Sequence, residues 1–341
     1  MDRLMNRMTI VSILVVFLGL IMGNKVTFGA ETPEEFFRGK TLLLITAPAG
    51  TPMDLISRII APTLAKEIGA KIKVENSGPD ETANFTYRGT RDGLTLGLTS
   101  SADLTGNEIL NAPGVQYKTD KFNFIADVYP SIKVLQLSPK LAYKTVDALR
   151  KAKGLRGGGT VAKGSIAVST AVMFEILGLD GKVITGFKGK KELTLAMTRG
   201  EVDLMATGDS TAARDEKDGL VFNLTTTSDK RSLTVPHVPS LSDLGVKVPK
   251  ELVPAQKFIS SNGSVVALPP GVPQERVEYL RRVFKSLGNN QDVQKAMEKL
   301  TGVWTPFVPG EELQRDMTEI IGDKELASRL DAIFKKYTAV R

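Results

Sequence analysis

The sequence predicts an α/β fold built on mainly parallel sheets. Short apolar runs alternate with longer amphipathic segments from Lys40 to the end of the chain, as in proteins whose strands are joined by helices. Glycine, proline, serine and threonine gather where the apolar runs end, which marks the turns between strands and helices. The length of 341 residues and a hydrophobic content of 42% supply enough apolar surface for one large or two medium domains.

Composition excludes several classes of chemistry. The chain has no cysteine, so disulfide bonds, thiolate nucleophiles and cysteine-held zinc are excluded. The single histidine, His237, argues against a histidine metal site or a catalytic triad. The formal net charge is +7, but the basic residues form small groups without interleaved aromatic residues, which argues against a nucleic-acid surface. We interpret these groups, Lys188, Lys190 and Lys191 among them, as solvated faces with a modest bias toward small anions or a membrane surface.

Residues 1–30 have the pattern of a secretory signal peptide. Arg3 and Arg7 supply a basic start, and an apolar run follows over residues 10–22. That run is short for a membrane-spanning helix of about 20 residues, which favours a cleaved signal over an uncleaved anchor. Small residues place the cleavage after Gly29 or Ala30, and the rest of the chain is then exported.

The first strand, 40–46, leads into a helix over 53–68 through a tight proline and glycine turn. Thr51 suits the N-cap because its hydroxyl can accept a hydrogen bond from the first turn. Pro52 then occupies the first helical position, where a missing N–H costs nothing. Asp54 falls three residues after the cap, where a carboxylate can reach back to it. A strand, a glycine turn and a helix N-terminus can together hold a small anion, or can simply form an ordinary capped connection.

The remaining elements follow the same alternation. Further strands are expected at 71–75, 94–98, 122–128, 133–137, 160–163, 183–186, 203–207, 220–226 and 264–268. Helices are expected at 82–88, 145–153, 165–177, 190–199, 274–287, 291–300 and 310–337, with a short one inside 236–244. Pro62 is expected to kink or split the first helix, because its ring clashes with the preceding turn.

Four polar loops follow predicted strands, at 47–54, 99–103, 163–169 and 207–210. Open α/β sheets bind ligands at the carboxyl ends of their strands. The four loops are therefore expected to converge on one polar crevice between two lobes.

Several short motifs occur in an order that resembles one known family. The motifs are Pro48-Ala49-Gly50-Thr51 followed by Asp54 and Arg58, Val74-Glu75-Asn76, Asp92-Gly93-Leu94-Thr95-Leu96, Gly164-Ser165, Phe187-Lys188-Gly189, Gly200-Glu201-Val202-Asp203, Val235-Pro236-His237-Val238-Pro239-Ser240-Leu241 and Leu268-Pro269-Pro270-Gly271-Val272-Pro273. In order and spacing they resemble the periplasmic receptors of tripartite tricarboxylate transporters, the Bug or TctC-like family. Two turns depart from the family pattern, since Thr51 replaces a glycine and residues 77–82 replace a glycine-rich turn.

The resemblance implies a two-lobed fold of the type II periplasmic-binding-protein kind, a Venus flytrap with a hinge. Residues 31–133 and 259–341 would then form the first lobe, and residues 134–258 the second. A periplasmic receptor of this family captures a small organic carboxylate and delivers it to the membrane subunits of the transporter. We expect it to act as a monomer, without catalysis, cofactor, metal or nucleic acid.

The resemblance also implies which loops clamp the carboxylate. The first-lobe candidates are Ala49, Gly50, Thr51, Asp54, Ser100 and Ser101, and the second-lobe candidates are Lys163, Gly164, Ser165, Ser169 and Asp209. Helix N-termini at Thr51 and Ser165 would face the carboxylate from opposite lobes, and neutral donors of this kind cost little to desolvate. The alternative for Asp54 and for the two serines of the 99–103 loop is helix capping alone, and Lys163 would otherwise be a surface lysine.

Two other functions fit the same features. A periplasmic receptor that presents its ligand to a sensor kinase would share both fold and site. An enzyme on a similar two-lobed fold is disfavoured, because the chain has no cysteine, no second histidine, no HExxH metal motif and no GxSxG elbow.

Overall fold

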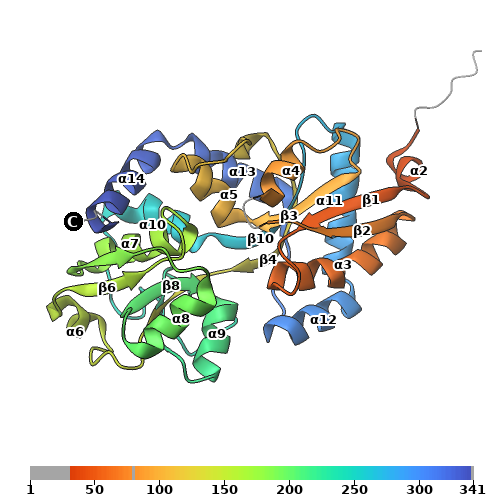
Figure 1. The fold of residues 1–341 in the computed structure, drawn as a ribbon. Helices are drawn as coiled ribbons and strands as arrows, with labels where there is room; N and C mark the ends of the chain where they lie inside the picture. The colour runs from red at the N-terminus through yellow and green to blue at the C-terminus, as the bar shows by residue number, and fades with distance from the viewer. Residues whose placement is uncertain (1–30, 79–80, 339–341) are drawn as a thin grey trace, which may run out of the picture. The chain divides into compact units, whose positions relative to one another are not determined.

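The computed structural model describes residues 31–78 and 81–338, so the predicted signal peptide, residues 1–30, lies outside the described residues. The chain divides into a unit that ends at Phe36 and a second unit of residues 37–341, and each is described by itself. Helix α2 covers Pro33–Phe37. The strands and the remaining helices belong to the second unit (Figure 1).

The first sheet has six strands in the order β11-β4-β10-β3-β1-β2. They are β1 (Thr41–Thr46), β2 (Lys71–Asn76), β3 (Thr95–Ser100), β4 (Asn123–Ser131), β10 (Asn262–Leu268) and β11 (Val308–Pro309). Strand β1 pairs in parallel with β2 and β3, whereas β10 pairs antiparallel with β3 and β4. Every residue of β3 is buried, as expected of a strand covered on both faces.

The second sheet has five strands in the order β7-β6-β8-β5-β9. They are β5 (Lys133–Leu137), β6 (Leu155–Gly158), β7 (Gly181–Ile184), β8 (Leu204–Gly208) and β9 (Phe222–Thr226). Strand β6 pairs in parallel with β7 and β8, but β5 pairs antiparallel with β8 and β9. Both sheets are therefore mixed, and the prediction of mainly parallel sheets is wrong in that detail. Strand β10 runs against the parallel strands of the first sheet, and β5 runs against those of the second sheet. Strand β4 pairs antiparallel with β10 and so runs in the same direction as β3.

Helices cover the sheets. They are α3 (Pro52–Ile68), α4 (Glu81–Tyr87), α5 (Ser101–Ile109), α6 (Val146–Lys151), α7 (Ser165–Leu177), α8 (Lys190–Arg199), α9 (Asp209–Lys217), α10 (Val253–Ser260), α11 (Gln274–Gly288), α12 (Gln291–Thr301), α13 (Gly310–Gly322) and α14 (Lys324–Thr338), with 3-10 turns η1 (Thr119–Lys121) and η2 (Lys250–Leu252). Helix α3 contacts β2, α11 contacts β4, and α7 contacts β8 (Figure 1). Within the described ranges, a helix with the length and apolar content needed to cross a membrane does not occur.

The first connection forms as the sequence predicts. Thr51 is the N-cap of α3, and its hydroxyl accepts a hydrogen bond from the N–H of Asp54 at 3.4 Å. Helix α3 ends at Ile68, and Gly69 follows with a left-handed φ of 63°. Pro62 lies inside the helix without ending it, so of the two expected outcomes the split is wrong.

The glycine run before α7 has a different role from the predicted one. Residues 160–163, predicted as a strand, form a turn, and strand β6 instead includes Gly157 and Gly158. A Cβ atom at Gly157 would lie 2.8 Å from the ring of Phe174, and one at Gly158 would lie 2.5 Å from Leu193. The strand therefore consists partly of glycine because helices pack directly onto its backbone.

Three further local predictions are wrong. The predicted last helix, 310–337, is two helices, because Asp323 has an extended ψ of 94° and its carboxylate accepts the N–H of Leu326 in the first turn of α14. Residues 129–131, expected between two strands, continue β4. Residues 236–244 form turns rather than a short helix, with prolines at two of the positions.

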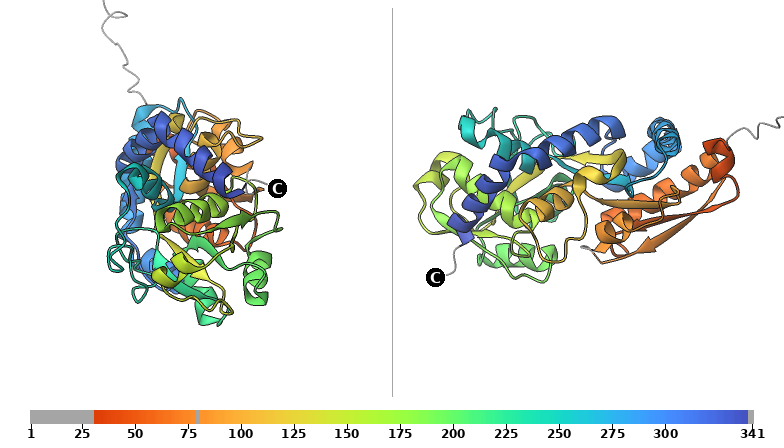
Figure 2. Two further views of the ribbon diagram at one scale, coloured as in Figure 1. Left: turned by 90° about the vertical axis from the view of Figure 1, so that its left-hand side faces the viewer. Right: turned by 90° about the horizontal axis from the view of Figure 1, so that it is seen from above.

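The chain passes directly from the first sheet to the second at Ile132, between β4 and β5, and returns through α10 and β10. The C-terminal helix then contacts α7, beside the second sheet: the rings of Phe174 and Tyr337 are 5.3 Å apart, and the Lys336 ammonium donates to Glu175 at 2.6 Å. Figure 2 shows this dark-blue helix beside the green segment that contains α7. The predicted lobe boundaries stay a prediction.

Candidate ligand-binding site

The loop after β1 is held by the carboxylate of Asp54. This carboxylate accepts hydrogen bonds from the N–H of Gly50 at 2.9 Å, from Arg58 at 3.0 Å and from Asn76 at 2.8 Å. Burial alone would raise the pKa of Asp54, but the hydrogen bonds from Arg58, Asn76 and Gly50 lower it to about 2. Asp54 therefore organises the loop, which agrees with the capping alternative. The Gly50 N–H is occupied by this contact, and the Thr51 N–H donates to Pro48 at 3.2 Å.

The loop after β3 is also occupied by structural contacts. Ser100 is the N-cap of α5 and accepts the N–H of Asp103 at 3.2 Å. The hydroxyl of Ser101 accepts the N–H of Gly263 at 2.9 Å, which ties α5 to β10. Both serines thus act in the fold, and a contact of either with ligand stays a prediction. Asp103 lies in the first turn of α5, on the same loop.

A buried lysine lies beside the N-terminus of α7. Lys133 is the first residue of β5 and is 3% exposed. Its ammonium donates to the hydroxyls of Ser165 at 2.6 Å and of Ser169 at 2.7 Å. These two serines are four residues apart and so lie on one face of α7. Both serines are among the predicted second-lobe candidates, and the structure places the Lys133 ammonium against both hydroxyls. Their contact with ligand stays a prediction.

Burial lowers the pKa of Lys133 to about 8, while the charge of Asp103 raises it and that of Lys190 lowers it further. An ammonium in a buried position loses much of its hydration, and two hydroxyl oxygens replace only part of it. An anion placed against this group would supply the missing counter-charge.

A second lysine of the same kind lies at the start of α8. The ammonium of Lys190 donates to the hydroxyl of Thr211 on α9 at 2.7 Å. Burial of this ammonium lowers the pKa of Lys190 to about 8. The charges of Asp215 and Asp103 raise this pKa, and the charge of Arg214 lowers it. The residue as a whole keeps partial solvent exposure. Its interpretation as part of a solvated face is therefore wrong at the ammonium group.

Asp103 links the two lysines. It acts on the pKa of both ammonium groups from α5, although α5 packs with the first sheet and both lysines belong to the second. Charged side chains from elements of both sheets therefore act on one another. The convergence of the four polar loops on one crevice stays a prediction. The residues involved are Asp103, Lys133, Ser165, Ser169, Lys190 and Thr211, here called the lysine cluster.

Lys163 and Gly164 precede α7. Lys163 has a left-handed φ of 61°, and its ammonium contacts the carbonyl of Leu110 and the carboxylate of Asp331, each at 3.2 Å. Lys163 is thus partnered by another part of the chain, and its contact with ligand stays a prediction. Gly164 is the N-cap of α7 and has no side chain, so the first N–H groups of this helix receive no hydrogen bond acceptor from the N-cap side chain.

Asp209 lies at the passage between the sheets. Its carboxylate accepts the hydroxyl of Ser232 at 2.7 Å, the N–H of Ile132 at 3.3 Å and the N–H of Ser210 at 2.8 Å. Burial raises the pKa of Asp209, against these hydrogen bonds, which lower it. The contacts fix the crossing strand beside the start of α9, and a ligand contact of Asp209 stays a prediction.

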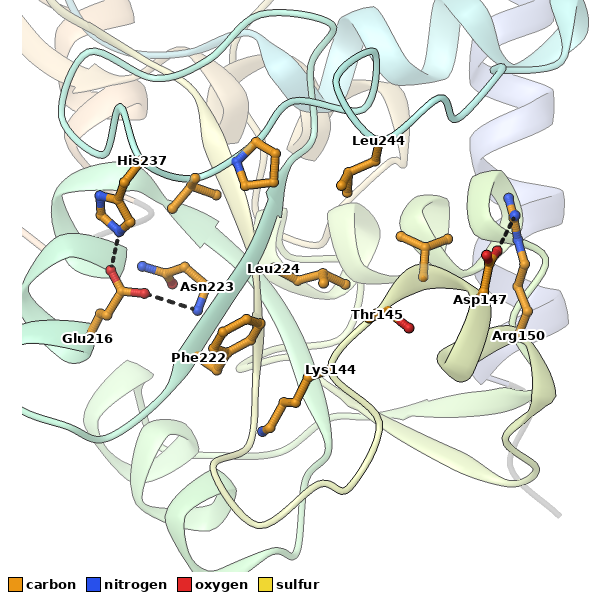
Figure 3. Close-up of a pocket in the computed structure, with 13 residues that line it drawn as sticks. Lys144, Thr145, Asp147, Arg150, Glu216, Phe222, Asn223, Leu224, His237 and Leu244 are labelled. Carbon is orange, nitrogen blue, oxygen red and sulfur yellow. Dashed lines mark hydrogen bonds and ion pairs between the residues drawn. The ribbon is translucent and has the colours of Figure 1, made fainter.

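A separate pocket of about 400 Å³ lies beside β9 and contains none of the predicted ligand residues. Figure 3 shows two pairs of its side chains in contact, and the Lys144 side chain apart from them. His237 contacts Glu216 at 2.7 Å, and Arg150 contacts Asp147 at 3.4 Å. No cluster of three or more metal-ligating side chains occurs in the part of the chain that the structure describes.

Comparison with known proteins decides the family. A model described as the tripartite tricarboxylate transporter family receptor matches residues 56–310, well over half of the chain. The chain belongs to this receptor family. The curated protein BugT of Bordetella pertussis (strain Tohama I) is 24% identical to this receptor over 253 residues, which cover 70% of this chain and 73% of BugT.

Two solved structures share the fold of the receptor. MatC from Rhodopseudomonas palustris with bound malate has a TM-score of 0.66 and 19% identity, and the match covers 86% of this chain and 99% of MatC. A TctC solute-binding protein from Polaromonas, without ligand, has a TM-score of 0.68 and 18% identity, and the match covers 87% of this chain and 98% of that one. The predicted class, a two-domain α/β fold like that of periplasmic binding proteins, is confirmed.

Sequence analysis missed both lysines of the cluster. Lys133 begins a strand whose next two residues, Val134 and Leu135, are apolar, and a lysine beside such a run is a signal that its charge has a specific partner. Lys190 stands among other basic residues and carries no such local signal. Its position depends on the contact between α8 and α9.

Proposed function

We propose that this chain is a periplasmic receptor that captures a small organic carboxylate and passes it to the membrane subunits of a tripartite tricarboxylate-type transporter. Membership of the receptor family supports the role, and MatC, which shares the fold, holds malate. The observation that carries the proposal is the buried ammonium of Lys133 between two hydroxyls. The receptor acts by binding alone, as a monomer.

The ligand carboxylate binds against Lys133, with Ser165 and Ser169 positioning the ammonium. Each hydroxyl can accept from Lys133 and still donate its own proton to a carboxylate oxygen. The N-terminus of α7 adds backbone N–H groups that can donate to the ligand carboxylate. The loops of the first lobe close over the ligand from the other side, so that ligand contacts with both lobes favour the closed form.

The test is a thermal-shift and calorimetric screen of the purified protein with malate, succinate, citrate, benzoate and a neutral diamide. At least one acid is expected to raise the melting temperature, because a ligand that binds the folded protein stabilises it. The diamide carries no negative charge and is expected to leave the melting temperature unchanged. Lys133→Met should weaken the best acid by about 10- to 100-fold, the loss expected for a charged hydrogen bond.

Lys188→Met is the matched control, since Lys188 is an exposed lysine that lies just before α8. Its affinity should equal that of the wild-type protein. Equal affinities for wild type and Lys133→Met would refute the assignment, and a chemically altered ligand recovered after incubation would refute a purely binding role.

A further inference from the structure

The lysine cluster contains two cation centres, each built on different helices. Lys133 is held by hydroxyls of α7, and Lys190 is held by a hydroxyl of α9. The two hydroxyl sets share no residue, so each ammonium has its own position rather than a common hydrogen-bond network. Lys133 pairs across the sheet with Gly208, which is the N-cap of α9, the helix that carries Thr211. The two centres therefore lie near each other, and the charge of Lys190 acts on Lys133.

The direct polar contacts of the two ammonium groups with the described residues are hydroxyls. Asp103 acts on both ammonium groups through its charge and accepts no hydrogen bond from either. The carboxylate of Asp215, whose charge also acts on Lys190, is itself paired with Arg214 at 3.1 Å. A buried ammonium without a direct anion is unfavourable, so both centres favour an anionic group from outside the chain.

We propose that Lys190 and Thr211 bind a second acidic group of the ligand, at the end opposite to the carboxylate held by Lys133. Lys190 is then the residue that selects ligands with two acidic groups over ligands with one. The inference rests on the proposed function, because it takes the first carboxylate at Lys133 as given. A single carboxylate shared by both ammonium groups is the competing arrangement, and it predicts a different response to substitution.

The experiment compares matched pairs of acids that differ by one carboxylate: succinate with butyrate, glutarate with valerate, and malate with 2-hydroxybutyrate. Calorimetry gives the affinity of each for the wild-type protein and for Lys190→Gln. We expect the wild type to prefer one diacid to its monoacid partner. Lys190→Gln should weaken that diacid by about 10- to 100-fold and leave the monoacid unchanged, because only the second carboxylate has lost its partner.

Two further variants separate binding from structure. Lys191→Gln removes the same charge from an exposed neighbouring residue and should leave every affinity unchanged. Lys190→Arg keeps the charge and should restore part of the preference for the diacid, which a merely structural role of Lys190 would not produce. Thermal unfolding of each free variant verifies that it is folded.

Three results would overturn the inference. Equal weakening of diacid and monoacid by Lys190→Gln would mean one shared carboxylate. A wild-type protein that binds monoacids as tightly as diacids would refute the selection and leave the proposed function standing. A wild-type protein that binds none of these acids or the wider panel would refute both.

Discussion

Asp127 is a buried carboxyl group of the first sheet. It is 6% exposed, lies on β4, and accepts the N–H of Tyr129 at 3.1 Å. Burial raises the pKa of Asp127 to about 7, although hydrogen bonds from the backbone of Tyr129 and Ser264 lower it in part. The neighbouring strand meets it with Gly263, where a Cβ atom would lie 1.9 Å from the carboxylate. The fold therefore leaves space for this carboxyl group, and the groups that lower its pKa are backbone N–H groups rather than a positively charged side chain.

The pKa of Asp127 gives a pH dependence of stability. Between its usual value of 3.8 and its folded value of about 7, the native state holds a proton that the unfolded state has lost. Stability should therefore fall as the pH rises through this range, at about 1.4 kcal/mol for each pH unit at most. Urea unfolding of Asp127→Asn should show a smaller loss between the two pH limits than the wild type. Asp147→Asn, at an exposed position, is the control. The same loss in all three proteins would contradict the assignment.

Helix α7 depends on the glycines of the preceding segment for its position. A Cβ atom at Gly159 would lie 2.4 Å from the Cβ of Ala167, in the first turn of the helix. Because Ser165 and Ser169 lie on this helix, the same contact sets the distance from their hydroxyls to Lys133. The packing of one glycine thus reaches the proposed ligand site through the helix.

Gly159→Ala should push α7 outward. The expected cost is about 1–3 kcal/mol of stability, as for other overpacked positions, together with weaker binding of the acid found in the screen. Denaturant unfolding and calorimetry measure the two effects. Gly322→Ala is the control, since the space around Gly322 is open and its φ is ordinary. Unchanged affinity in Gly159→Ala would show that the helix position does not control binding.

At the scale of the whole molecule, three segments join the elements of the two sheets. The first is the passage from β4 to β5, the second runs from β9 through α10 to β10, and the third runs from α13 to α14. Helix α13 contacts β4, whereas α14 contacts α7, α10 and β7. Buried side chains fix α14 there, among them Leu330, Phe334 and Tyr337.

A chain that ends at Asp323 should therefore be clearly destabilised, because it exposes the face of α7 that α14 covers. Phe334→Ala tests the same contact with one side chain, and truncation of a buried phenylalanine typically costs about 3–5 kcal/mol. Thermal unfolding measures both effects. Glu325→Ala, at an exposed position of α14, should unfold like the wild type. A truncated chain with unchanged melting behaviour would mean that α14 adds nothing to the fold.

Local rules account for what could be predicted from the sequence. The cap at Thr51 and the proline after it follow from one or two neighbouring residues, and the structure confirms them. The alternation of strands and helices follows from periodicity, which is also local. The direction of a strand in a sheet depends on distant parts of the chain. This explains why the antiparallel directions of β10 in the first sheet and of β5 in the second sheet were not predicted.

The candidate site was predicted in part for the same reason. Ser165 and Ser169 are recognisable because they share a helix face after a glycine. Lys133 and Lys190 lie on different elements, and only tertiary contacts bring both under the influence of Asp103. The spacing of these three residues in the sequence does not indicate that they lie near one another. The roles of Asp54 and Ser100 within the fold were recognisable as alternatives, since capping is again a matter of near neighbours. The contact of Ser101 with Gly263 joins distant parts of the chain and was not recognisable in this way.

The two buried ammonium groups also bear on the evolution of the receptor. A lysine whose pKa is lowered by burial disfavours the folded state at neutral pH, because the unfolded chain holds the same charge in water. The two ammonium groups therefore favour a negative charge beside them, which the proposed ligand would supply. Selection for stability alone would replace both lysines with apolar residues. Their retention would trade stability of the empty form for recognition, so that the most stable variant of this protein would be one that no longer binds.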